Sequence, residues 1–329
     1  MSRAGVDERI LHFLRETEGF LSGEELSARL GVSRTAIWKH IKGLRLKGYR
    51  INAVPAKGYS LLSPADLLAP MDIGSGLATR RVGREIICLK EIDSTNTHAF
   101  RLAEEGAAEG TVVLADTQTA GKGRLGRTWL SPPGVNLYCS VILRPPIAPL
   151  AACQLTFLSV VAVARAVEKC TTLVSEIKWP NDLLVSGKKV CGLLNEMNAE
   201  TEQVNFVVLG IGVNLNMTAE QLGNGLRHPA TSLMEEGGVA VDRVAFTRVL
   251  LEELDSLYDL FLTQGERPVR EEWLARSDLR DRGVTVVMGD RVLQGVARGV
   301  DQFGALLVER PDGAVETVLS GDVTLQKRA

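Results

Sequence analysis

The spacing of apolar residues changes twice along this chain of 329 residues, and these changes constrain the fold more than any single motif does. The first 65 residues have the spacing of short helices followed by a hairpin, whereas residues 66–280 mix strand-like runs with helices. From about residue 281 onward, short strand-like runs alternate with turns. We therefore predict a multidomain α+β protein with three domains, at 1–65, 66–280 and 281–329.

The first domain carries the pattern of a helix-turn-helix. Ser22 with Glu25 fits a capping box at the start of one helix, and Gly31 is placed to end it. Ser33 is a suitable cap for a second helix. That helix would bury apolar residues at the spacing i, i+4, i+7, namely Ile37, Ile41 and Leu44. The run YRINAVPAKGYSLL follows with two short β-prone segments, so a β wing is expected after the helices.

Basic side chains are concentrated in this first domain, although the whole chain has a formal net charge of −2. Between Leu26 and Ala65 there are eight Lys or Arg residues and no Asp or Glu. A local excess of positive charge favours a polyanionic partner. We predict that the domain binds DNA through Ser33, Arg34, Thr35, Lys39, His40, Lys42 and Lys57. A helical packing module with a solvated basic face is the alternative.

The cysteine and histidine patterns argue against a structural metal or disulfide framework. Five cysteines are widely spaced without any CxxC pair, and the four histidines stand apart from one another. The start MSRAGVDERI is polar, and the most apolar stretch, residues 155–167, contains Thr156, Ser159 and Arg165 and is too short to span a bilayer. We expect a cytoplasmic protein with no membrane partner.

The most unusual segment of the predicted central domain is QTAGKGRLGRTW, residues 118–129. It alternates three glycines with three cations, which are Gly121, Gly123, Gly126, Lys122, Arg124 and Arg127. Glycines let the backbone approach a ligand closely, and cations donate charge-assisted hydrogen bonds to phosphates or carboxylates. The segment is not a Walker A loop, which needs GK followed by Ser or Thr. Taken alone, it is equally consistent with a mobile surface loop.

Two further segments gather polar side chains. In KWPNDLLVSGKKVCGLL, Lys178, Asn181 and Asp182 meet at a strand end and Lys189 begins the next strand. These groups could bind Mg²⁺, a ribose or an α-phosphate, or they could form an ordinary turn with two solvated lysines. In DSTN, residues 93–96, one side chain is expected to cap a helix. The surplus hydroxyls could instead hold a small polar ring.

These segments together resemble the bifunctional biotin–protein ligases, which are also called biotin operon repressors. The resemblance covers nearly the whole chain and rests on five motifs in the family's order, namely STN from Ser94, QxAGxGRxGRxW from Gln118, KWPND from Lys178, GKKVCGLLNE from Gly187 and GIGVNLN from Gly210. It implies an N-terminal winged helix-turn-helix, a central biotin/lipoate ligase-like mixed β-sheet with helices, and a small C-terminal SH3-like β-barrel. Lipoate ligases share a related central fold, but GRxGRxW with KWPND is similar to the biotin branch.

The resemblance also implies roles for individual residues. Biotin would be bound by Ser94, Thr95, Asn96, Gln118, Gly121, Lys122, Gly123, Arg124, Lys189 and Gly192. The nucleotide would be bound by Arg127, Trp129, Lys178, Asn181, Asp182 and Asn214. Arg124 and Lys189 would be the catalytic cations that face the biotin carboxylate and the α-phosphate. Lys122 stands where relatives often carry arginine, and lysine lacks the planar fork needed for a bidentate contact.

The implied reaction has two steps. Biotin and ATP, with Mg²⁺, would give biotinyl-5'-AMP and pyrophosphate, and a lysine of a biotin carboxyl carrier protein would then accept the biotin. Operator DNA and, with adenylate bound, a second copy of the chain are the other implied partners. The Mg²⁺ ligands are left open because the substrate phosphates could supply most of them. The alternatives are a non-catalytic biotin-sensing transcription regulator, a lipoate or other acyl ligase on the same scaffold, and a structural DNA-binding protein.

Overall fold

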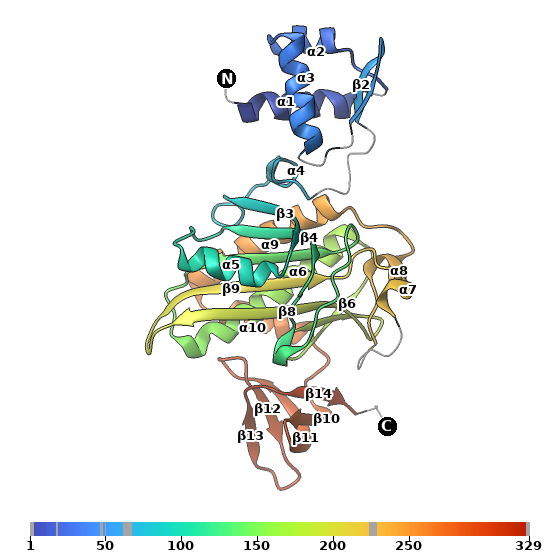
Figure 1. Ribbon diagram of the computed structural model, residues 1–329. Helices are drawn as coiled ribbons and strands as arrows, with labels where there is room; N and C mark the ends of the chain where they lie inside the picture. The colour runs from blue at the N-terminus through green and yellow to red at the C-terminus, as the bar shows by residue number, and fades with distance from the viewer. Residues whose placement is uncertain are drawn as a thin grey trace. The chain divides into compact units, whose positions relative to one another are not determined.

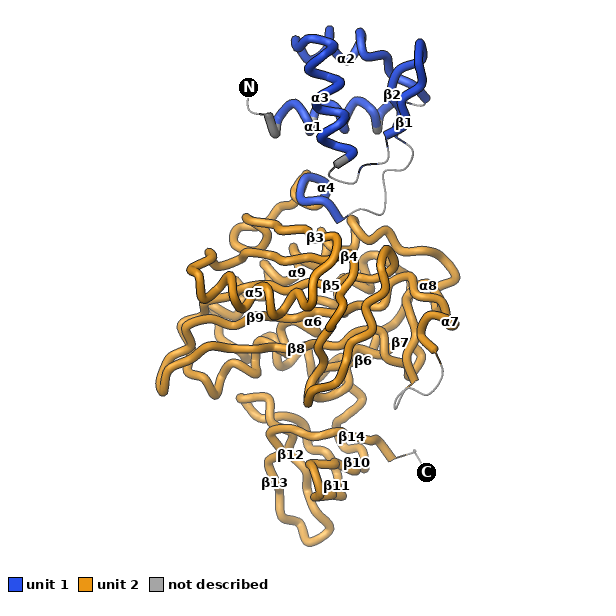
Figure 2. Tube along the Cα trace, viewed as in Figure 1, with its two compact units in different colours: residues 1–72 blue, residues 73–329 orange. Residues whose placement is uncertain are grey.

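The computed structural model describes residues 3–17, 19–46, 49, 51–61, 68–223 and 229–326 of the chain (Figure 1). The chain divides into two compact units, residues 1–72 and residues 73–329 (Figure 2). Each unit has its own set of packed elements. We call them unit 1 and unit 2.

Unit 1 is a winged helix-turn-helix, as predicted. Its elements are α1 (Arg3–Glu16), α2 (Gly23–Leu30), α3 (Arg34–Leu46) and an antiparallel hairpin of β1 (Ile51–Val54) and β2 (Gly58–Leu61). The hydroxyl of Ser22 accepts a hydrogen bond from the Glu25 amide, and Gly31 ends α2 in the left-handed conformation at φ 69°. The hydroxyl of Ser33 accepts from the Ala36 amide and so caps α3.

The wing is fixed to the helices by its backbone. Leu21, just before α2, and Tyr59 in β2 exchange two backbone hydrogen bonds of 2.8 Å each. Gly58 precedes Tyr59, and a β-carbon on Gly58 would lie 2.3 Å from the Leu21 carbonyl oxygen. Position 58 must therefore be glycine for the two backbones to meet. The predicted apolar stripe of α3 is buried, with Ile37, Ile41 and Leu44 at most 2% exposed.

Unit 2 is built on a seven-stranded mixed sheet with the strand order β3-β4-β5-β9-β8-β7-β6. The strands in this order are Ile86–Ile92, Val112–Gln118, Leu137–Leu143, Val204–Val213, Lys188–Ala199, Asp182–Val185 and Ser175–Lys178. Only β3 and β4 pair in parallel, and all other neighbours are antiparallel. The mixed sheet confirms the fold predicted for the central part of the chain.

Helices cover both faces of this sheet (Figure 1). On one face α5 (Thr95–Glu104) packs against β4, β5 and β9. On the other face α6 (Gln154–Cys170) packs against β6 to β9, and α9 (Arg243–Gln264) and α10 (Arg267–Ala275) pack on α6. The short helices are α4 (Pro70–Gly74), α7 (Ala219–Leu222) and α8 (Leu233–Gly237), with 3₁₀ turns η1 (Arg124–Gly126) and η2 (Pro149–Cys153).

Helix α6 explains the most apolar part of the sequence. Together with η2 it forms a segment, Pro149–Cys170, that is long and apolar enough to cross a bilayer by length and composition. In the structure 61% of this segment's most apolar window is buried, and the helix lies between the sheet and α9. Burial inside unit 2 therefore accounts for its hydrophobic residues.

The C-terminal part of unit 2 is a five-stranded antiparallel sheet with the order β13-β12-β11-β10-β14. In chain order its strands are β10 (Arg282–Met288), β11 (Arg291–Val300), β12 (Leu306–Glu309), β13 (Val315–Val318) and β14 (Asp322–Leu325). The Trp179 indole donates a hydrogen bond of 3.0 Å to the carbonyl of Gly304, which joins this sheet to the central one. The predicted domain boundaries after residues 65 and 280 stay a prediction, because the contacts divide the chain only after Asp72.

Candidate active site

The candidate site lies on the α5 face of β8 and β9. Phe206 and Val208 of β9 pack against α5. Side chains two residues apart in a strand share a face. Gly210 and Gly212 therefore continue this face of β9 beyond the N-terminal end of the helix. A pocket of about 260 Å³ opens there. All of the predicted biotin and nucleotide residues line this pocket except Gly121. The structure thus brings together segments that are far apart in the sequence.

Paired glycines form the floor of one end of the pocket. Gly192 in β8 and Gly212 in β9 are direct cross-strand partners. A β-carbon on Gly212 would lie 2.6 Å from the indole nitrogen of Trp129, and one on Gly192 would lie 2.8 Å from the same ring. The indole therefore lies flat on bare backbone, which only glycine leaves exposed. Its Nε1 atom is buried and has no hydrogen-bond partner.

Lys189 lies beside this ring in a half-buried position. Its ammonium group is 2.6 Å from the Asp182 carboxylate and 5.3 Å from the centre of the Trp129 ring. The side chain of Lys189 is 25% exposed, so the alternative of a solvated lysine is wrong for this residue. A cation held between a carboxylate and an aromatic face is positioned to meet an incoming anion.

The opposite end of the pocket is a chain of hydrogen bonds. The side-chain oxygen Oε1 of Gln118 accepts a hydrogen bond from the Thr95 backbone amide at 2.8 Å and one from the Thr95 hydroxyl at 3.1 Å. The Ser140 hydroxyl lies 2.9 Å from the Thr95 hydroxyl and 2.7 Å from the Asn96 side-chain oxygen. The Asn96 amide donates to the Leu194 carbonyl and to Glu196, at 2.9 Å each. These contacts fix the directions in which the buried polar groups face a ligand.

Ser94 illustrates how the structure decides between two interpretations. It occupies the N-cap position of α5, yet its side chain makes no capping hydrogen bond. The carboxylate of Asp93 instead accepts from the Ser94 amide at 2.7 Å. Ser94 is buried, at 2% exposed, and lines the pocket. Because no capping bond uses its hydroxyl, that group is available to a bound molecule. The simple capping role is therefore wrong for this hydroxyl.

The glycine-and-cation loop, residues 118–129, closes one side of the pocket. Its backbone is held by hydrogen bonds from Gly123 to Arg127 at 2.7 Å and from Trp129 to Gly121 at 2.8 Å. Gly121 is buried rather than pocket-lining, and a β-carbon there would lie 2.5 Å from the Trp129 carbonyl oxygen. The loop's tip, Leu125, has φ 58° and is 73% exposed.

The two arginines of the loop are held by different partners. Arg124 donates to the Asn181 side-chain oxygen at 3.0 Å, and the Asn181 amide donates to the Leu193 carbonyl at 2.6 Å. Burial lowers the pKa of Arg124, and the nearby carboxylate of Asp182 opposes that shift. Arg127 forms an ion pair of 2.6 Å with Asp322, whose hydrogen bond raises the pKa of Arg127. The C-terminal sheet therefore reaches into the pocket.

The pocket does not contain a ready-made metal cage. Within the described ranges, no group of three or more His, Cys, Asp or Glu side chains is placed to hold an ion. Of the pocket's carboxylates, Asp182 pairs with Lys189 and Asp322 pairs with Arg127. The residues present do not fit a resident metal ion.

Comparisons with known proteins agree with this geometry. Residues 88–214 match the Biotin/lipoate A/B protein ligase family, residues 7–60 match an HTH domain, and residues 281–325 match the Biotin protein ligase C terminal domain. The bifunctional ligase/repressor BirA of Bacillus subtilis (strain 168) is 39% identical over 310 residues, covering 93% of this chain and 94% of that protein. The chain belongs to the family of biotin protein ligases.

Other members of the family support the same assignment. The bifunctional ligase/repressor BirA of Escherichia coli (strain K12) is 35% identical over 308 residues, which cover 93% of each chain. Among solved structures, a biotin protein ligase from Aquifex aeolicus in complex with biotin and ATP has a TM-score of 0.63 at 30% identity. It covers 74% of this chain and 100% of that one.

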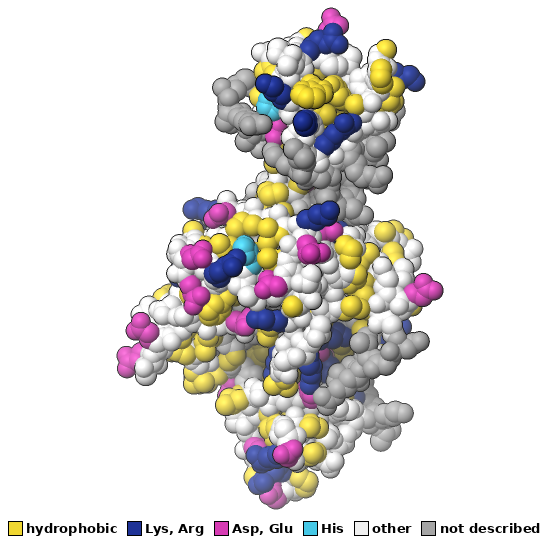
Figure 3. Space-filling model, in the orientation of Figure 1, with side chains coloured by type: hydrophobic (Ala, Val, Ile, Leu, Met, Phe, Trp, Pro, Cys, Tyr) yellow, Lys and Arg dark blue, Asp and Glu magenta, His cyan; other side chains and the backbone are white. Residues whose placement is uncertain are grey.

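Unit 1 of this ligase presents most of the residues predicted to bind DNA on one surface. Arg34, Thr35, Lys39 and Lys42 are exposed on α3, and Lys57 lies in the turn between β1 and β2. Figure 3 shows Lys and Arg side chains around an exposed hydrophobic cluster on the face of unit 1 in view.

His40 stands apart from this set. It is half-buried, and its Nδ1 lies 2.7 Å from the Asp7 carboxylate of α1. The structure therefore places it in the packing of α3 on α1, because it faces away from the exposed side of α3.

Several residues of the ligase pocket were not predicted from the sequence. Gly210 and Gly212 lie within the quoted GIGVNLN motif, but their contacts with Asn96 and Trp129 depend on strand register. Tyr138 lines the pocket from the middle of an apolar strand. Asp322 comes from a different sheet, and its partner Arg127 precedes it by 195 residues. Only the fold could have indicated this pair.

Proposed function

We propose that this chain is a biotin–protein ligase that also acts as a DNA-binding repressor of biotin synthesis genes. It forms biotinyl-5'-AMP from biotin and ATP and transfers biotin to a lysine of a biotin carboxyl carrier protein. The observation that carries the proposal is the single pocket in which a polar network, an aromatic platform and two held cations, Arg124 and Lys189, face one another. We place the reaction in the cytoplasm, where both small substrates are present.

The two ends of the pocket suit the two substrates. Biotin occupies the end with the Thr95–Gln118 and Asn96–Ser140 hydrogen bonds, since its ring needs matched donors and acceptors in a buried site. ATP occupies the end with Trp129, whose flat indole on the paired glycines offers a stacking surface for adenine. The ribose and phosphates then lie near Lys178, Asn181, Asp182 and Asn214.

The first step needs positive charge where the substrates join. The biotin carboxylate attacks the α-phosphorus of ATP, an anhydride bond forms, and pyrophosphate leaves with its electron pair. Arg124 and Lys189 stabilise the negative charge that grows on the α-phosphate and on the leaving group. Asn181 directs Arg124 and Asp182 directs Lys189, so both cations are in place before attack. We propose that Mg²⁺ arrives on the ATP phosphates, which supply oxygen ligands that this pocket lacks as a set.

The second step transfers the activated biotin. The carrier's lysine amine, in its neutral form, attacks the carbonyl carbon of the adenylate, and AMP leaves. Water would hydrolyse the same anhydride, so the loop at residues 118–129 has to cover it until the carrier docks. Hydrogen bonds at Gly121 and Gly123 shape the loop. The contacts of Arg124 with Asn181 and of Arg127 with Asp322 tie it to the pocket.

A direct assay tests the ligase function. Protein is mixed with labelled biotin, ATP, Mg²⁺ and a biotin carrier domain, and both pyrophosphate release and label on the carrier are measured. We expect both signals. Tight biotin binding without pyrophosphate would favour a biotin-sensing regulator, and turnover with lipoate alone would favour the lipoate branch.

The repressor function rests on unit 1. α3 carries Arg34, Thr35, Lys39 and Lys42 on its exposed side, Lys57 extends the basic surface onto the wing, and Ser33 begins the helix. We propose that two copies of the chain associate when adenylate is bound and so place two α3 helices on a two-fold-symmetric operator. Ligation consumes the adenylate and weakens the dimer. Sedimentation that remains monomeric with and without biotinyl-5'-AMP would contradict this part of the proposal.

A further inference from the structure

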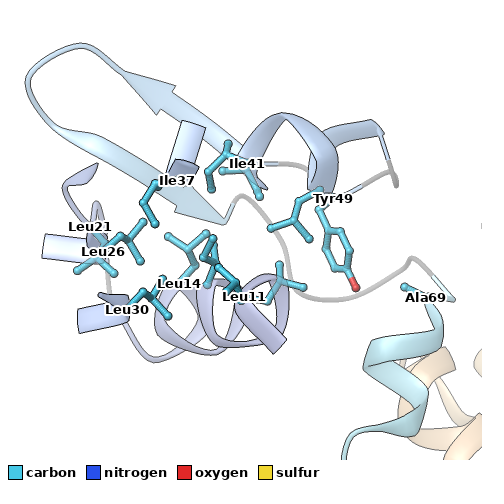
Figure 4. Close-up of a cluster of buried hydrophobic side chains, with 13 residues drawn as sticks. Leu11, Leu14, Leu21, Leu26, Leu30, Ile37, Ile41, Tyr49 and Ala69 are labelled. Atoms are coloured by element: carbon cyan, nitrogen blue, oxygen red, sulfur yellow. The ribbon is translucent and has the colours of Figure 1, made fainter. Parts of the chain in front are cut away.

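One side of α3 is exposed and carries an aromatic residue that the core does not use. The buried side of the helix points Ile37 and Ile41 into the core of unit 1 (Figure 4). Trp38 lies on the other side and is 53% exposed. Of the described large hydrophobic residues in unit 1, only Trp38 and Phe20 are exposed, and Phe20 is less so, at 37%. An exposed apolar surface on a helix that is proposed to face a partner indicates a contact with that partner.

The immediate neighbours of Trp38 are cations. Lys42, one turn later on α3, holds its ammonium group 5.5 Å from the centre of the indole ring. Arg34 lies one turn earlier and is also exposed. There is no Asp or Glu between Leu26 and Ala65. A partner that covers Trp38 must therefore offer an apolar spot surrounded by negative charge.

Duplex DNA has this combination in its major groove. Phosphates line both edges of the groove, and the C5-methyl group of thymine is an apolar group on its floor. The only hydrogen-bonding group of an indole is one N–H donor, so Trp38 is poorly suited to read guanine or adenine by paired hydrogen bonds. Its position between Arg34 and Lys42 places the ring at the centre of the exposed face of α3, while the cations reach outward to phosphates.

We propose that Trp38 reads thymine by covering its methyl group in the major groove, and so sets part of the operator preference. The inference rests on the proposed DNA-binding function and adds a specificity-determining residue to it. It predicts that each half of the preferred DNA sequence contains a thymine whose recognition is lost when the indole is removed.

The test compares sequence preferences of the full chain. Random duplex DNA is enriched on the wild-type chain in the presence of biotin, ATP and Mg²⁺, and the enrichment is repeated with Trp38→Ala, Trp38→Phe and Lys39→Ala. We expect Trp38→Ala to lose the preference for thymine at one position of each half-site and to keep the others. Trp38→Phe should retain part of it. Lys39→Ala should weaken binding to all sequences without changing the preference, because a phosphate contact carries no base information.

A second measurement isolates the methyl group. The thymine identified in the wild-type sequence is replaced by deoxyuridine, which lacks only that methyl. Wild-type affinity should fall about fourfold per half-site, the effect of one buried methyl group, and the affinity of Trp38→Ala should not change. Circular dichroism of each variant checks that unit 1 is folded.

The outcomes separate the inference from the function on which it rests. An identical thymine preference in the wild type and Trp38→Ala, or an equal deoxyuridine effect in both, would overturn the role of Trp38 and leave DNA binding intact. A wild-type chain that enriches no sequence would overturn the repressor function and this inference together.

Discussion

The indole nitrogen of Trp129 lies so close to the backbone of Gly212 that a β-carbon on that glycine would be 2.6 Å away. Real β-carbons essentially never approach another heavy atom within 3.0 Å, so the ring and the glycine depend on each other. Gly192, the cross-strand partner of Gly212, supports the same ring from the next strand. The two glycines therefore determine how closely the Trp129 ring lies on the sheet.

Replacing Gly212 therefore tests the proposed nucleotide end of the pocket. In Gly212→Ala the new methyl group must displace the indole, and we expect the KM for ATP to rise about tenfold while the KM for biotin changes little. Initial rates of pyrophosphate release at varied ATP and varied biotin would measure both constants. Gly74→Ala is the control, because a β-carbon at Gly74 meets nothing within 4 Å. An unchanged KM for ATP in Gly212→Ala would show that Trp129 does not bind the nucleotide.

Lys189 provides a test of the catalytic charge. In Lys189→Met the side chain keeps its length but loses its ammonium group, and Asp182 loses its 2.6 Å partner. Loss of a preorganised charge commonly lowers the rate about 10²- to 10³-fold, which we expect for kcat of adenylate formation. The adjacent Lys188 pairs with Glu236 outside the pocket, so Lys188→Met is a matched control on the same strand. Equal rates in the two variants would remove Lys189 from the mechanism.

The ion pair between Arg127 and Asp322 predicts a contribution of the C-terminal sheet to substrate binding. Asp322→Asn removes the charge that holds Arg127, and a partly exposed ion pair contributes up to about 1 kcal/mol. We expect the KM for ATP to rise up to about fivefold with kcat nearly unchanged. Glu316→Gln, which breaks the Arg291 pair on the same sheet but away from the pocket, should leave both constants unaltered. A fall in kcat without a change in KM would contradict a purely positioning role.

The sequence predicted the parts of the fold that local spacing determines. The capped helices around Gly31 and the hairpin that follows them depend on residues close together in the chain, and the structure contains both. The motif residues of the pocket were predicted through resemblance, and their convergence is a property of strand register. Nothing in the local sequence places Gly192 opposite Gly212.

Contacts between distant segments could not be predicted from the sequence. His40 sits in a basic segment, but its pairing with Asp7 depends on how α1 crosses α3, so its predicted DNA contact was based on sequence position alone. Asp322 was not predicted as a pocket residue, because the pattern of turns and strands in the C-terminal part does not indicate which edge of its sheet faces the pocket. The helical spacing places Trp38 off the buried stripe of Ile37, Ile41 and Leu44, but it does not indicate what the exposed ring contacts.

Ion pairs of Glu253 in α9 with Arg165 and Lys169 in α6 make the stability of unit 2 depend on pH. Burial acts to raise the pKa of Glu253, but hydrogen bonds from Lys169 and Arg165 outweigh burial, so the pKa is lowered. A carboxylate with a lowered pKa in the folded state stabilises the fold above its unfolded pKa of about 4.3, and this contribution is lost as the pH falls through the lowered value.

Glu253→Gln should therefore reduce the free energy of unfolding of unit 2 by about 2 kcal/mol at pH 7, the effect of lost hydrogen bonds to a charged group. The difference from the wild type should narrow as the pH falls below about 4. Urea unfolding at pH 7, 5 and 3.5 would measure it. Glu271→Gln, whose pair with Arg267 is exposed, should change stability by less than about 0.5 kcal/mol. A constant difference at every pH would contradict the assigned charge state.

Formation of biotinyl-5'-AMP without a carrier would show directly that one pocket joins the two substrates. The chain is incubated with biotin, Mg²⁺ and ATP labelled at the α-phosphate, without any carrier, and protein-bound nucleotide is separated and identified. We predict labelled biotinyl-5'-AMP in an amount that approaches the amount of protein, together with released pyrophosphate, and neither product in Lys189→Met on the same time scale. Bound biotin and bound ATP that remain unjoined in the wild-type chain would contradict the central claim.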